Sequence, residues 1–437
     1  MSDPVPAVAG QRGAPVAGRP LRAGPHSAPL QGWWARHWRL VVLVLVLPLF
    51  GQTMYYMKDI KPAWALSKAF PVLSLPLIVP LLTRQRVPLL LAWLGVFVWL
   101  VLVSSFIGIF TFEQNFFLGL SAQVKLLPML HIFSFLGLLL LLRPTIDEVL
   151  RAFMICGLLT FATVFLLWAL APQSWYVTSI EVGDAPLLSA DDRGNRIRMP
   201  MYFGLIAMFA LYRRLLTRPD WRAAALFALA MAIIVGIVRT RAVVLASVGT
   251  LALVTFMAAP PRWRFAAAAG AMLGALALLQ VPYVQSAFDT SSASGFDVRQ
   301  ISAAKAMAFL DGNPLRWLLG VGTITSLDAG GLAKFFNHYF FLGDISLLGI
   351  VFEFGLIGAG MLLYLQLRAI LFAQRLRRSI DSPRVAALQD YVLFALILAP
   401  LYSTMTLQAG EVSVIAASLA YLWIVLGDAR SGRADGA

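Results

Sequence analysis

The sequence predicts an all-α polytopic membrane protein with about twelve transmembrane helices and one large, partly helical external loop. Of its 437 residues, 60% are hydrophobic and only 13% are charged, and the mean hydropathy is +0.79. A soluble core cannot bury that much apolar side chain. The apolar segments are continuous runs rather than alternating ten-residue strands, which argues against an outer-membrane barrel.

The excess of basic over acidic residues also fits a polytopic membrane protein. A net charge of +14 and a pI near 10.3 are expected when short loops carry arginines toward anionic lipid headgroups. The alternative, a nucleic-acid-binding protein, lacks an aromatic-basic module. The single cysteine, Cys156, lies in an apolar run, so neither a disulfide nor a thiolate metal cluster is expected.

The two ends of the chain are predicted to be cytoplasmic tails. Residues 1–38 are expected to form a disordered tail, because residues 1–32 are rich in Pro, Ala and Gly and lack apolar periodicity. An aromatic-basic belt at Trp33, Trp34 and Trp38 then precedes the first span. The hydrophobic run begins too late for a usual signal peptide and has no small-residue cleavage site after it. Residues 428–437 form the second tail.

Twelve spans account for most of the remainder, nine within 39–281 and three within 344–427, on either side of a loop at 282–343. Each span needs about 20 apolar residues to cross about 30 Å, so the shorter ones include flanking residues. Pro71, Pro76 and Pro80 interrupt the second span, which leaves two topologies open for 58–87. The expected spans are 39–57, 69–82, 88–109, 117–142, 151–171, 199–212, 223–239, 242–259, 265–281, 344–367, 391–407 and 412–427.

Orientation follows from the basic connections, since Lys and Arg concentrate in short cytoplasmic loops. Five connections that fall on one side carry arginines, and that side is predicted to be the cytoplasm. These residues are Arg84 and Arg86; Arg143 and Arg151; Arg213, Arg214, Arg218 and Arg222; Arg262 and Arg264; and Arg368, Arg375, Arg377, Arg378 and Arg384.

Three segments are then external: 172–198, the tight connection 239–241, and 282–343. A structureless loop as long as the third is unusual, so a folded, functional element is expected there. Within it, 298–310 has the apolar spacing of an interfacial helix, and the turn residues Asp311-Gly312-Asn313-Pro314 end that helix.

The arginines in the external segments are the first candidate site. Short external loops of membrane proteins contain few Lys and Arg residues, so those present there need another explanation. The guanidinium group is always charged and binds phosphate through two parallel hydrogen bonds. We therefore expect the set to bind an anion at the outer membrane face. The alternative for any single arginine is snorkelling, or pairing with Asp184, Asp191, Asp192 or Asp297. The set is Arg193, Arg196, Arg198, Arg239, Arg241 and Arg299.

Three further ionisable residues are candidates. His338 is the one histidine expected at the outer face beside the long loop, where it can act as a base near neutral pH; the alternative is an ordinary polar interfacial residue. Lys125 lies near the outer end of the fourth span, a functional position by default, although a long side chain can snorkel. Glu353, inside the tenth span, can pair with Lys125 or an arginine, or carry protons.

The acidic residues show no Asp-x-Asp motif, no His/Cys ligand spacing and no Gly-x-x-x-x-Gly-Lys loop. Nucleotide hydrolysis is therefore not supported. Asp191-Asp192 gives only poor support for a metal site, and no metal is expected.

Several short motifs occur in the order and spacing of a known family. Asn337-His338-Tyr339-Phe340 followed by Glu353-Phe354-Gly355-Leu356-Ile357-Gly358 resembles the His…Glu-x-Gly-x-x-Gly signature of the O-antigen ligase and polymerase superfamily. Thr240-Arg241-Ala242 resembles its Ser-Arg-Gly/Ala element, with Thr in place of Ser. Arg299, followed by Asn313-Pro314-Leu315 and Gly320-Val321-Gly322, resembles its Arg…Pro-Leu…Gly-x-Gly loop. Arg196 to Gly204 resembles the opening of its sixth span, so the specific likeness covers roughly 190–360.

The resemblance implies a metal-independent, inverting glycosyltransferase of GT-C-like architecture in the bacterial inner membrane, with its active site and long loop facing the periplasm. The implied donor is glycan linked to undecaprenyl diphosphate. For the ligase, the implied acceptor is a sugar hydroxyl of lipid A core, during lipopolysaccharide assembly. Membrane lipid is a partner, nucleic acid is not, and no cofactor is expected.

The resemblance also assigns roles to residues. His338 matches the family's essential histidine, proposed there as the general base, and Arg241 and Arg299 match its essential arginines. Further candidates for binding the diphosphate are Arg198, Arg196 and Lys125. Candidates for a supporting role are Glu353, Asn337 and Arg193.

Other functions remain open from the sequence. An O-antigen polymerase or a protein O-oligosaccharyltransferase would use the same donor, although the absence of a large extra external domain disfavours the latter. A transporter of anionic glycolipids would need more polar groups in mid-span than the chain has. A non-enzymatic scaffold does not explain the external arginines.

Overall fold

The computed structural model describes residues 29–54, 57, 60–82, 87, 89–178, 186–191, 194–280, 295–323, 336, 340, 342–401 and 408–434. Contacts separate Met1–Trp38 from one compact unit, Arg39–Ala437, and the description below concerns that unit. Most of the expected N-terminal tail lies outside the described residues. Helix α1 (Pro29–Phe50) begins before the expected first span, so the last residues of that tail are helical.

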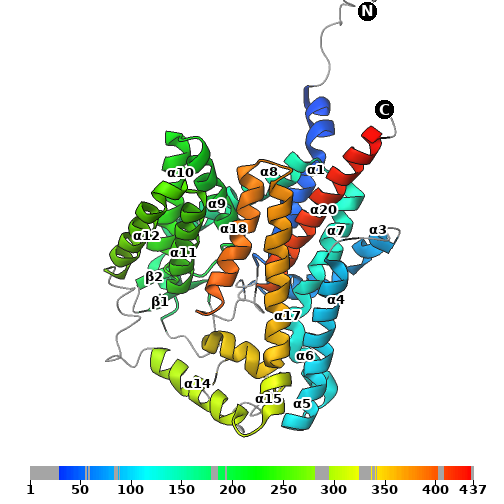
Figure 1. Ribbon diagram of the computed structural model, residues 1–437, viewed down its shortest axis with the longest axis vertical. Helices are drawn as coiled ribbons and strands as arrows, with labels where there is room; N and C mark the ends of the chain where they lie inside the picture. Colours follow the sequence, from blue (N-terminus) through cyan, green and yellow to red (C-terminus); the bar gives the residue numbers. More distant parts are fainter. Residues whose placement is uncertain are drawn as a thin grey trace, which may run out of the picture. The chain divides into compact units, whose positions relative to one another are not determined.

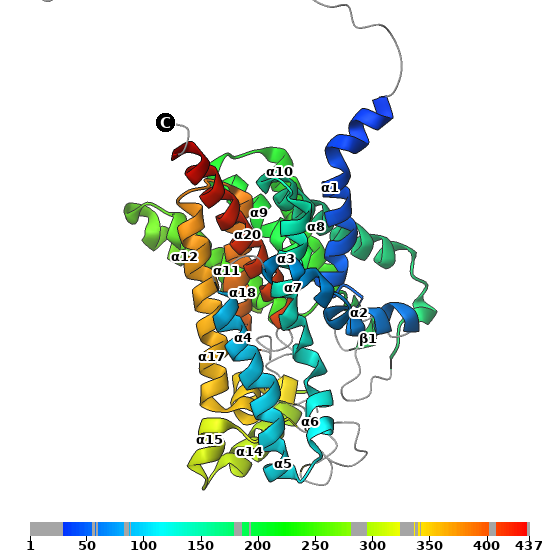
Figure 2. The ribbon, with the colours of Figure 1, turned by 90° about the vertical axis from the view of Figure 1, so that its right-hand side faces the viewer.

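The chain is a bundle of helices with one small sheet (Figures 1 and 2). The first half contains α2 (Lys61–Leu73), η1 (Leu75–Ile78), α3 (Val79–Leu82), α4 (Leu90–Val98), η2 (Trp99–Val103), α5 (Ser104–Phe112), α6 (Phe116–Ala122), η3 (Gln123–Leu130), α7 (His131–Leu142), α8 (Ile146–Leu170) and η4 (Gln173–Trp175). The sheet follows, as β1 (Leu188–Asp191) and β2 (Gly194–Ile197).

The second half is also helical. It contains α9 (Tyr202–Thr217), α10 (Trp221–Ile233), η5 (Ile234–Val238), α11 (Arg241–Ala258), η6 (Pro261–Trp263), α12 (Arg264–Leu279), α14 (Gly295–Leu310), α15 (Pro314–Leu319), η7 (Leu342–Ile345), α17 (Ser346–Arg377), α18 (Pro383–Leu398) and α20 (Ala409–Ala434). The helix expected over 298–310 is confirmed as α14, and it ends at the expected turn, with Gly312 at a φ of 75°.

Among the described residues, eight helical segments are long and apolar enough to cross a membrane, which agrees with a polytopic membrane protein. They coincide with eight of the expected spans, and the predicted count of about twelve is not confirmed. The other four expected positions hold α1, α9, α12 and α18. The last three have 16 residues each, fewer than the about 20 that a simple crossing requires.

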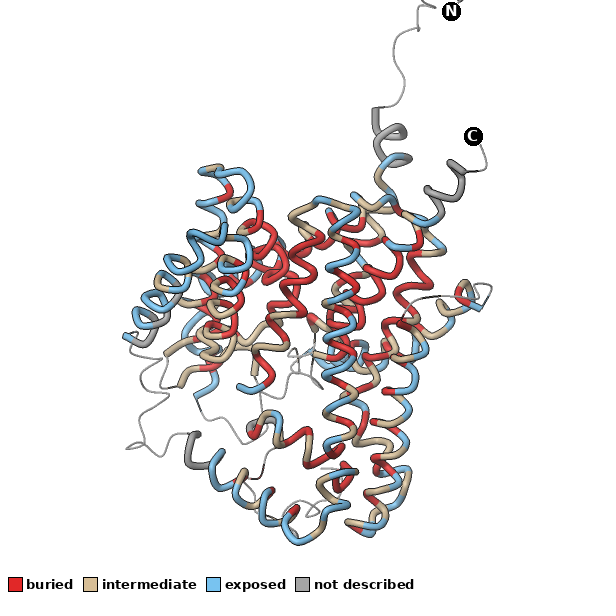
Figure 3. The backbone as a smooth tube through the Cα atoms, in the orientation of Figure 1, coloured by how far each residue is buried: buried red, intermediate tan, exposed pale blue. Residues whose placement is uncertain are grey.

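Helix α9 is the centre of the larger hydrophobic core and packs against α8, α10 and α18. Its Tyr202, Phe203 and Phe209 are almost fully buried. Helix α8 approaches closely at Gly157, where a Cβ would lie 2.5 Å from the carbonyl oxygen of Phe203. Figure 3 shows the buried residues concentrated in these central helices, whereas α10, α12 and α14 are largely exposed along their outer sides.

Several buried ionisable side chains inside this core have specific partners, which lowers the cost of placing them in an apolar surrounding. Arg213 of α9 makes two contacts of 2.7 Å with Asp390 of α18. The Tyr391 hydroxyl donates to the Glu411 carboxylate, and the Tyr202 hydroxyl donates to the Glu411 carbonyl oxygen at 3.1 Å. These bonds connect α9, α18 and α20 through specific partners as well as apolar contact.

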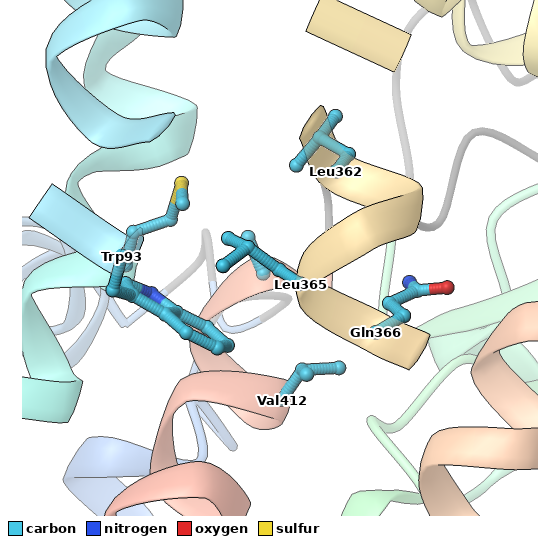
Figure 4. A pocket seen from close by; sticks show the side chains of 7 residues that line it. Trp93, Leu362, Leu365, Gln366 and Val412 are labelled. Carbon is cyan, nitrogen blue, oxygen red and sulfur yellow. The ribbon is translucent and has the colours of Figure 1, made fainter. Parts of the chain in front are cut away.

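A small pocket lies between α4, η3, α17 and α20 (Figure 4). Among the described residues that line it, Gln366 is the one with a polar amide side chain, and the Trp93 indole NH donates to Ser413 at 3.1 Å beside it. The residues that line it are Trp93, Met129, Leu362, Leu365, Gln366, Ala409 and Val412. An apolar lining of this kind marks a packing seam between the two halves of the chain.

Helix α17 is interrupted at Gly355, where φ is 69° and ψ is 178°. This break frees carbonyl groups that a continuous helix would use. The chain at 320–322 crosses the break and uses them: Val321 NH donates to Phe352 O at 2.8 Å, and Gly322 NH donates to Glu353 O at 3.1 Å. We call this contact of 320–322 with 352–355 the glycine crossing.

At the positions where the two backbones of the glycine crossing approach most closely, only glycine fits. A Cβ on Gly355 would lie 2.2 Å from Leu318 O, and one on Gly320 would lie 2.5 Å from Gly355 N. On the other side, a Cβ on Gly322 would lie 2.4 Å from the backbone nitrogen of Gly108 in α5. Irregular backbone at membrane depth is tolerated where protein buries it. The crossing therefore ties 320–322 to both α5 and α17.

The glycine crossing predicts a large cost for one added methyl group. Gly355→Ala places a Cβ at positive φ and against a carbonyl oxygen, so we expect a loss of about 2 kcal/mol or more in unfolding free energy. Gly360→Ala is the matched control in α17, because nothing lies within 4 Å of its Cβ position. That change should leave stability unchanged or raise it by up to about 1 kcal/mol. Equal thermal unfolding midpoints for the two variants in detergent would contradict the crossing.

Candidate functional site

The polar segment 172–198, which was expected to be external, ends in a β-hairpin that the sequence did not predict. Strands β1 and β2 are antiparallel, and Ser189 faces Arg196 in their register. Gly194 begins β2 at a φ of 80°, a conformation that glycine adopts without strain. Val177 adds a bridge to Ser189. The hairpin holds two of the external arginines, Arg196 and Arg198, on a short rigid element.

Arg196 is the more buried of the two, with 5% of its surface exposed. Its guanidinium contacts Asp191 at 3.0 Å, and its Nε donates to Ser189 Oγ at 3.2 Å. Arg198 donates from Nε to the same hydroxyl at 3.1 Å and is partly exposed. The pairing with Asp191 that the sequence left open is therefore present for Arg196.

The hairpin packs on the end of η5, next to the connection 239–241. Arg239 has a φ of 50° and donates from Nε to Gly236 O at 2.7 Å. A Cβ on Gly194 would lie 2.6 Å from a terminal guanidinium nitrogen of Arg239, so the tip of the hairpin leaves room for this side chain. Arginines from 194–198 and 239–241, far apart in the sequence, thus belong to one local cluster.

Helix α11 begins within this cluster. Thr240 is its N-cap residue and makes no side-chain capping bond, and Arg241 is its first residue and half-buried. The first backbone NH groups of a helix have no partners inside the helix, and the helix dipole places positive charge there. A helix N-terminus flanked by arginines is a physical arrangement suited to a phosphate. We call Arg196, Arg198, Arg239 and Arg241 the arginine cluster.

Arg299 lies on a different element, α14, and is exposed. The buried face of α14 comprises Ser302, Ala306 and Leu310, and Arg299 precedes this face by one turn. Helix α14 packs on η7, α15 and α17. The hairpin and α14 lie toward the same end of α9, α10 and α11 in both views (Figures 1 and 2). The described contacts do not join Arg299 to the arginine cluster.

Lys125 and Glu353 form an ion pair, with Nζ at 2.5 and 2.7 Å from the two carboxylate oxygens. The Glu353 side chain is 5% exposed and that of Lys125 is 26% exposed. The lysine also lies 5.8 Å from the Phe354 ring centroid. Glu353 balances the charge of Lys125 in this arrangement, which argues against a separate role for Lys125 in binding a diphosphate.

A buried polar network at the glycine crossing was not identified from the sequence. The Gln114 side chain donates to Thr323 O at 2.6 Å, and the Gln123 side chain donates to Thr323 Oγ at 2.6 Å and to Ser104 Oγ at 3.1 Å. Its members carry no charge and lie far apart in the sequence, so no local motif marks them. The network fixes the chain immediately after Gly322.

His338, Asn337 and Arg193 lie outside the described residues, as does Asp192. The positions of these residues relative to the other candidates are therefore not described. Phe336 and Phe340, two residues on either side of His338, are described. Among the side chains that the structure describes, no group of three His, Cys, Asp or Glu residues is placed to hold a metal ion.

Comparison with models of known protein families gives no match, and comparison with curated proteins gives none either. The arrangement itself places several arginines beside a helix N-terminus that has no side-chain cap, in a chain with eight candidate membrane-spanning helices among its described residues.

The Lys125–Glu353 pair can be tested for a structural role by a double-mutant cycle. Lys125→Met leaves a buried carboxylate without its partner, and breaking such a pair costs about 3 kcal/mol. Adding Glu353→Gln removes that charge, so the double variant should recover most of the loss in thermal unfolding midpoint. If the double variant is no more stable than Lys125→Met alone, Lys125 does not serve as the partner of Glu353.

Proposed function

We propose that this protein is a membrane glycosyltransferase that transfers glycan from undecaprenyl diphosphate to a sugar hydroxyl of lipid A core, as an O-antigen ligase does. The observation that carries the proposal is the arginine cluster, where the β-hairpin packs on η5, just before α11 begins. It contains four arginines from two segments of the chain, and Arg196 pairs with Asp191. Guanidinium groups bind phosphate through two parallel hydrogen bonds, so such a cluster suits a diphosphate.

The chemistry requires such a charge. Attack at the anomeric carbon breaks the bond to the diphosphate, and the leaving group gains negative charge as the bond lengthens. A guanidinium about 4 Å from a unit charge contributes about 4 kcal/mol at an effective dielectric constant near 20, against about 1 kcal/mol in bulk water. Since about 1.4 kcal/mol corresponds to a tenfold change in rate, fixed arginines at a partly dry interface can replace a divalent metal.

The roles of individual residues follow from the resemblance and from the chemistry. Arg241 and Arg299 bind the donor diphosphate, together with Arg198, while Arg196 holds the hairpin through Asp191 and Ser189. His338 removes the proton of the acceptor hydroxyl, which attacks from the face opposite the diphosphate and inverts the anomeric centre. Asn337 and Arg193 are supporting residues in this proposal.

The proposed location of the enzyme in a membrane follows from the lipid chain of the donor. Its polyprenyl chain lies in the bilayer while its diphosphate lies at the surface, so the enzyme is a membrane protein with its site at an interface. We place the chain in the bacterial inner membrane with the arginine cluster, α14 and His338 facing the periplasm. The positive-inside rule supports this orientation, because most other arginines lie in the connections predicted to be cytoplasmic.

Reconstitution with two acceptors tests the proposed reaction. The purified protein in lipid vesicles receives undecaprenyl-diphosphate-linked glycan together with either lipid A core or a second lipid-linked glycan, and the product is analysed by mass spectrometry. We expect transfer to lipid A core and no change on adding a chelator. Elongation of the second lipid-linked glycan instead would identify a polymerase, and no transfer to either acceptor would contradict the proposal.

Substitutions test the proposed roles of individual residues in the same assay. His338→Ala should abolish transfer without lowering protein yield, because the hydroxyl then lacks its base. Arg241→Gln and Arg299→Gln should raise the donor KM and lower kcat, because the diphosphate loses a charged partner in the ground and transition states. Arg378→Gln, on the predicted cytoplasmic side, is the control and should behave as wild type. Normal transfer by His338→Ala would remove the base assignment.

A further inference from the structure

One face of the β-hairpin is polar. Side chains alternate between the two faces of a strand, and residues directly opposite each other in an antiparallel pair share a face. Ser189 and Asp191 of β1 therefore lie on the same face as Arg196 of β2, which is opposite Ser189. Arg198 continues this face, and its backbone NH donates to the chain just before β1 at 2.8 Å. The other face carries Ile197, which is fully buried in the larger hydrophobic core.

The hydroxyl group of Ser189 is the contact that the two hairpin arginines share. Its oxygen accepts a hydrogen bond from Nε of Arg196 at 3.2 Å and another from Nε of Arg198 at 3.1 Å. The two Nε atoms therefore lie no more than 6.3 Å apart, the sum of these two distances. A serine oxygen has two lone pairs, so it can accept both bonds. Ser189 is 0% exposed, so water does not replace it as an acceptor.

The two arginines differ in how firmly they are held. Arg196 is buried, and Asp191 pairs with it at 3.0 Å, which offsets the repulsion between two neighbouring cations. Arg198 is only partly buried. The guanidinium group is a planar fork, so fixing its Nε restricts the direction of the whole group. Arg196 and Asp191 thus hold the serine hydroxyl in place, and this hydroxyl orients Arg198.

The backbone at Ser189 is fixed independently of the arginines. Val177 bonds to the two residues that flank Ser189, donating to one at 3.2 Å and accepting from the other at 3.0 Å, so β1 is paired on both edges. A second anchor involves Asn195, whose side chain exchanges two hydrogen bonds with Gln173 of η4, at 2.6 and 3.2 Å. Asn195 alternates with the arginines along β2, so this anchor belongs to the other face of the hairpin.

We propose that Ser189 is a positioning residue that holds Arg198 in the orientation that binds the phosphate groups of a lipid diphosphate. The inference rests on the function proposed above, in which Arg198 binds the donor diphosphate. Arginine binds phosphate through two parallel hydrogen bonds, which require a defined orientation of the guanidinium plane. Ordering a long side chain at the moment of binding costs free energy, so an arginine that is already oriented binds more tightly. Ser189 acts through Arg198.

The test uses farnesyl diphosphate and the purified full-length protein in detergent, with Kd obtained from thermal unfolding against ligand concentration. Ser189→Ala removes the shared acceptor without changing the charge. We expect Kd to rise about tenfold, because the hydrogen bond that orients a charged group is lost. The dependence of Kd on salt should stay as in wild type. Arg198→Gln removes the charge, and it should both raise Kd and reduce the salt dependence.

Three further variants separate orientation from general stability of the hairpin. Asn195→Ala removes two hydrogen bonds from the same hairpin but from its other face, so Kd should stay within about twofold of wild type. Ser189→Thr keeps the hydroxyl group and should bind as wild type does. Ser189→Cys keeps the volume of the side chain but has only a weak acceptor. It should lose affinity as Ser189→Ala does, and it serves as the test if the alanine variant does not fold.

The outcomes distinguish the role of Ser189 from the proposed reaction. A wild type whose farnesyl diphosphate binding depends on Ser189, but which transfers no glycan, would sink the proposed function and keep the positioning role. A wild type that transfers glycan and has the same Kd as Ser189→Ala and Ser189→Cys would overturn the positioning role. Equal losses of affinity in Ser189→Ala and Asn195→Ala would also overturn it, as would a wild type that does not bind farnesyl diphosphate.

Discussion

An extended stretch of chain crosses a broken transmembrane helix at Gly355, and this contact fixes the chain that follows α14 and α15. The break in α17 frees the carbonyl groups of Phe352 and Glu353, and 320–322 occupies them. Glycines at 320, 322 and 355 permit this approach, since a Cβ at any of them would meet backbone atoms within 2.6 Å. On one side the crossing leads back to α14 and α15, and on the other to the segment that contains His338.

The cations of the chain fall into groups with different physical roles. Arg213 and Lys125 each face a buried carboxylate, Asp390 and Glu353, and hold helices together. Breaking such pairs leaves a buried charge without a partner, so they are structural. The arginine cluster differs, because its four arginines come from the hairpin and from the connection that leads into α11, and Arg196 pairs with Asp191, which is only partly buried. These arginines lie beside a helix N-terminus, which is a place suited to a phosphate.

Hydrophobic runs and turn residues were sufficient to predict the helical class and α14, because these depend on local composition. They were not sufficient for the β-hairpin at 188–197, whose strands are four residues each and whose Ser189–Arg196 register needs the pairing itself. The break at Gly355 and the network of Gln114, Gln123 and Thr323 also escaped, because each depends on a partner more than thirty residues away. Three expected spans proved to be helices of 16 residues, since apolar composition does not fix helix length.

The most direct measurement is the binding of farnesyl diphosphate, a short lipid diphosphate, to the purified protein. Thermal unfolding in detergent is followed against ligand concentration for wild type and Arg241→Gln, with farnesol as the neutral control. We predict saturable stabilisation of the wild type by farnesyl diphosphate, weakened by salt and by Arg241→Gln, and no comparable effect of farnesol. Equal effects of the diphosphate and farnesol, or equal binding by both proteins, would contradict an arginine cluster that binds the donor diphosphate.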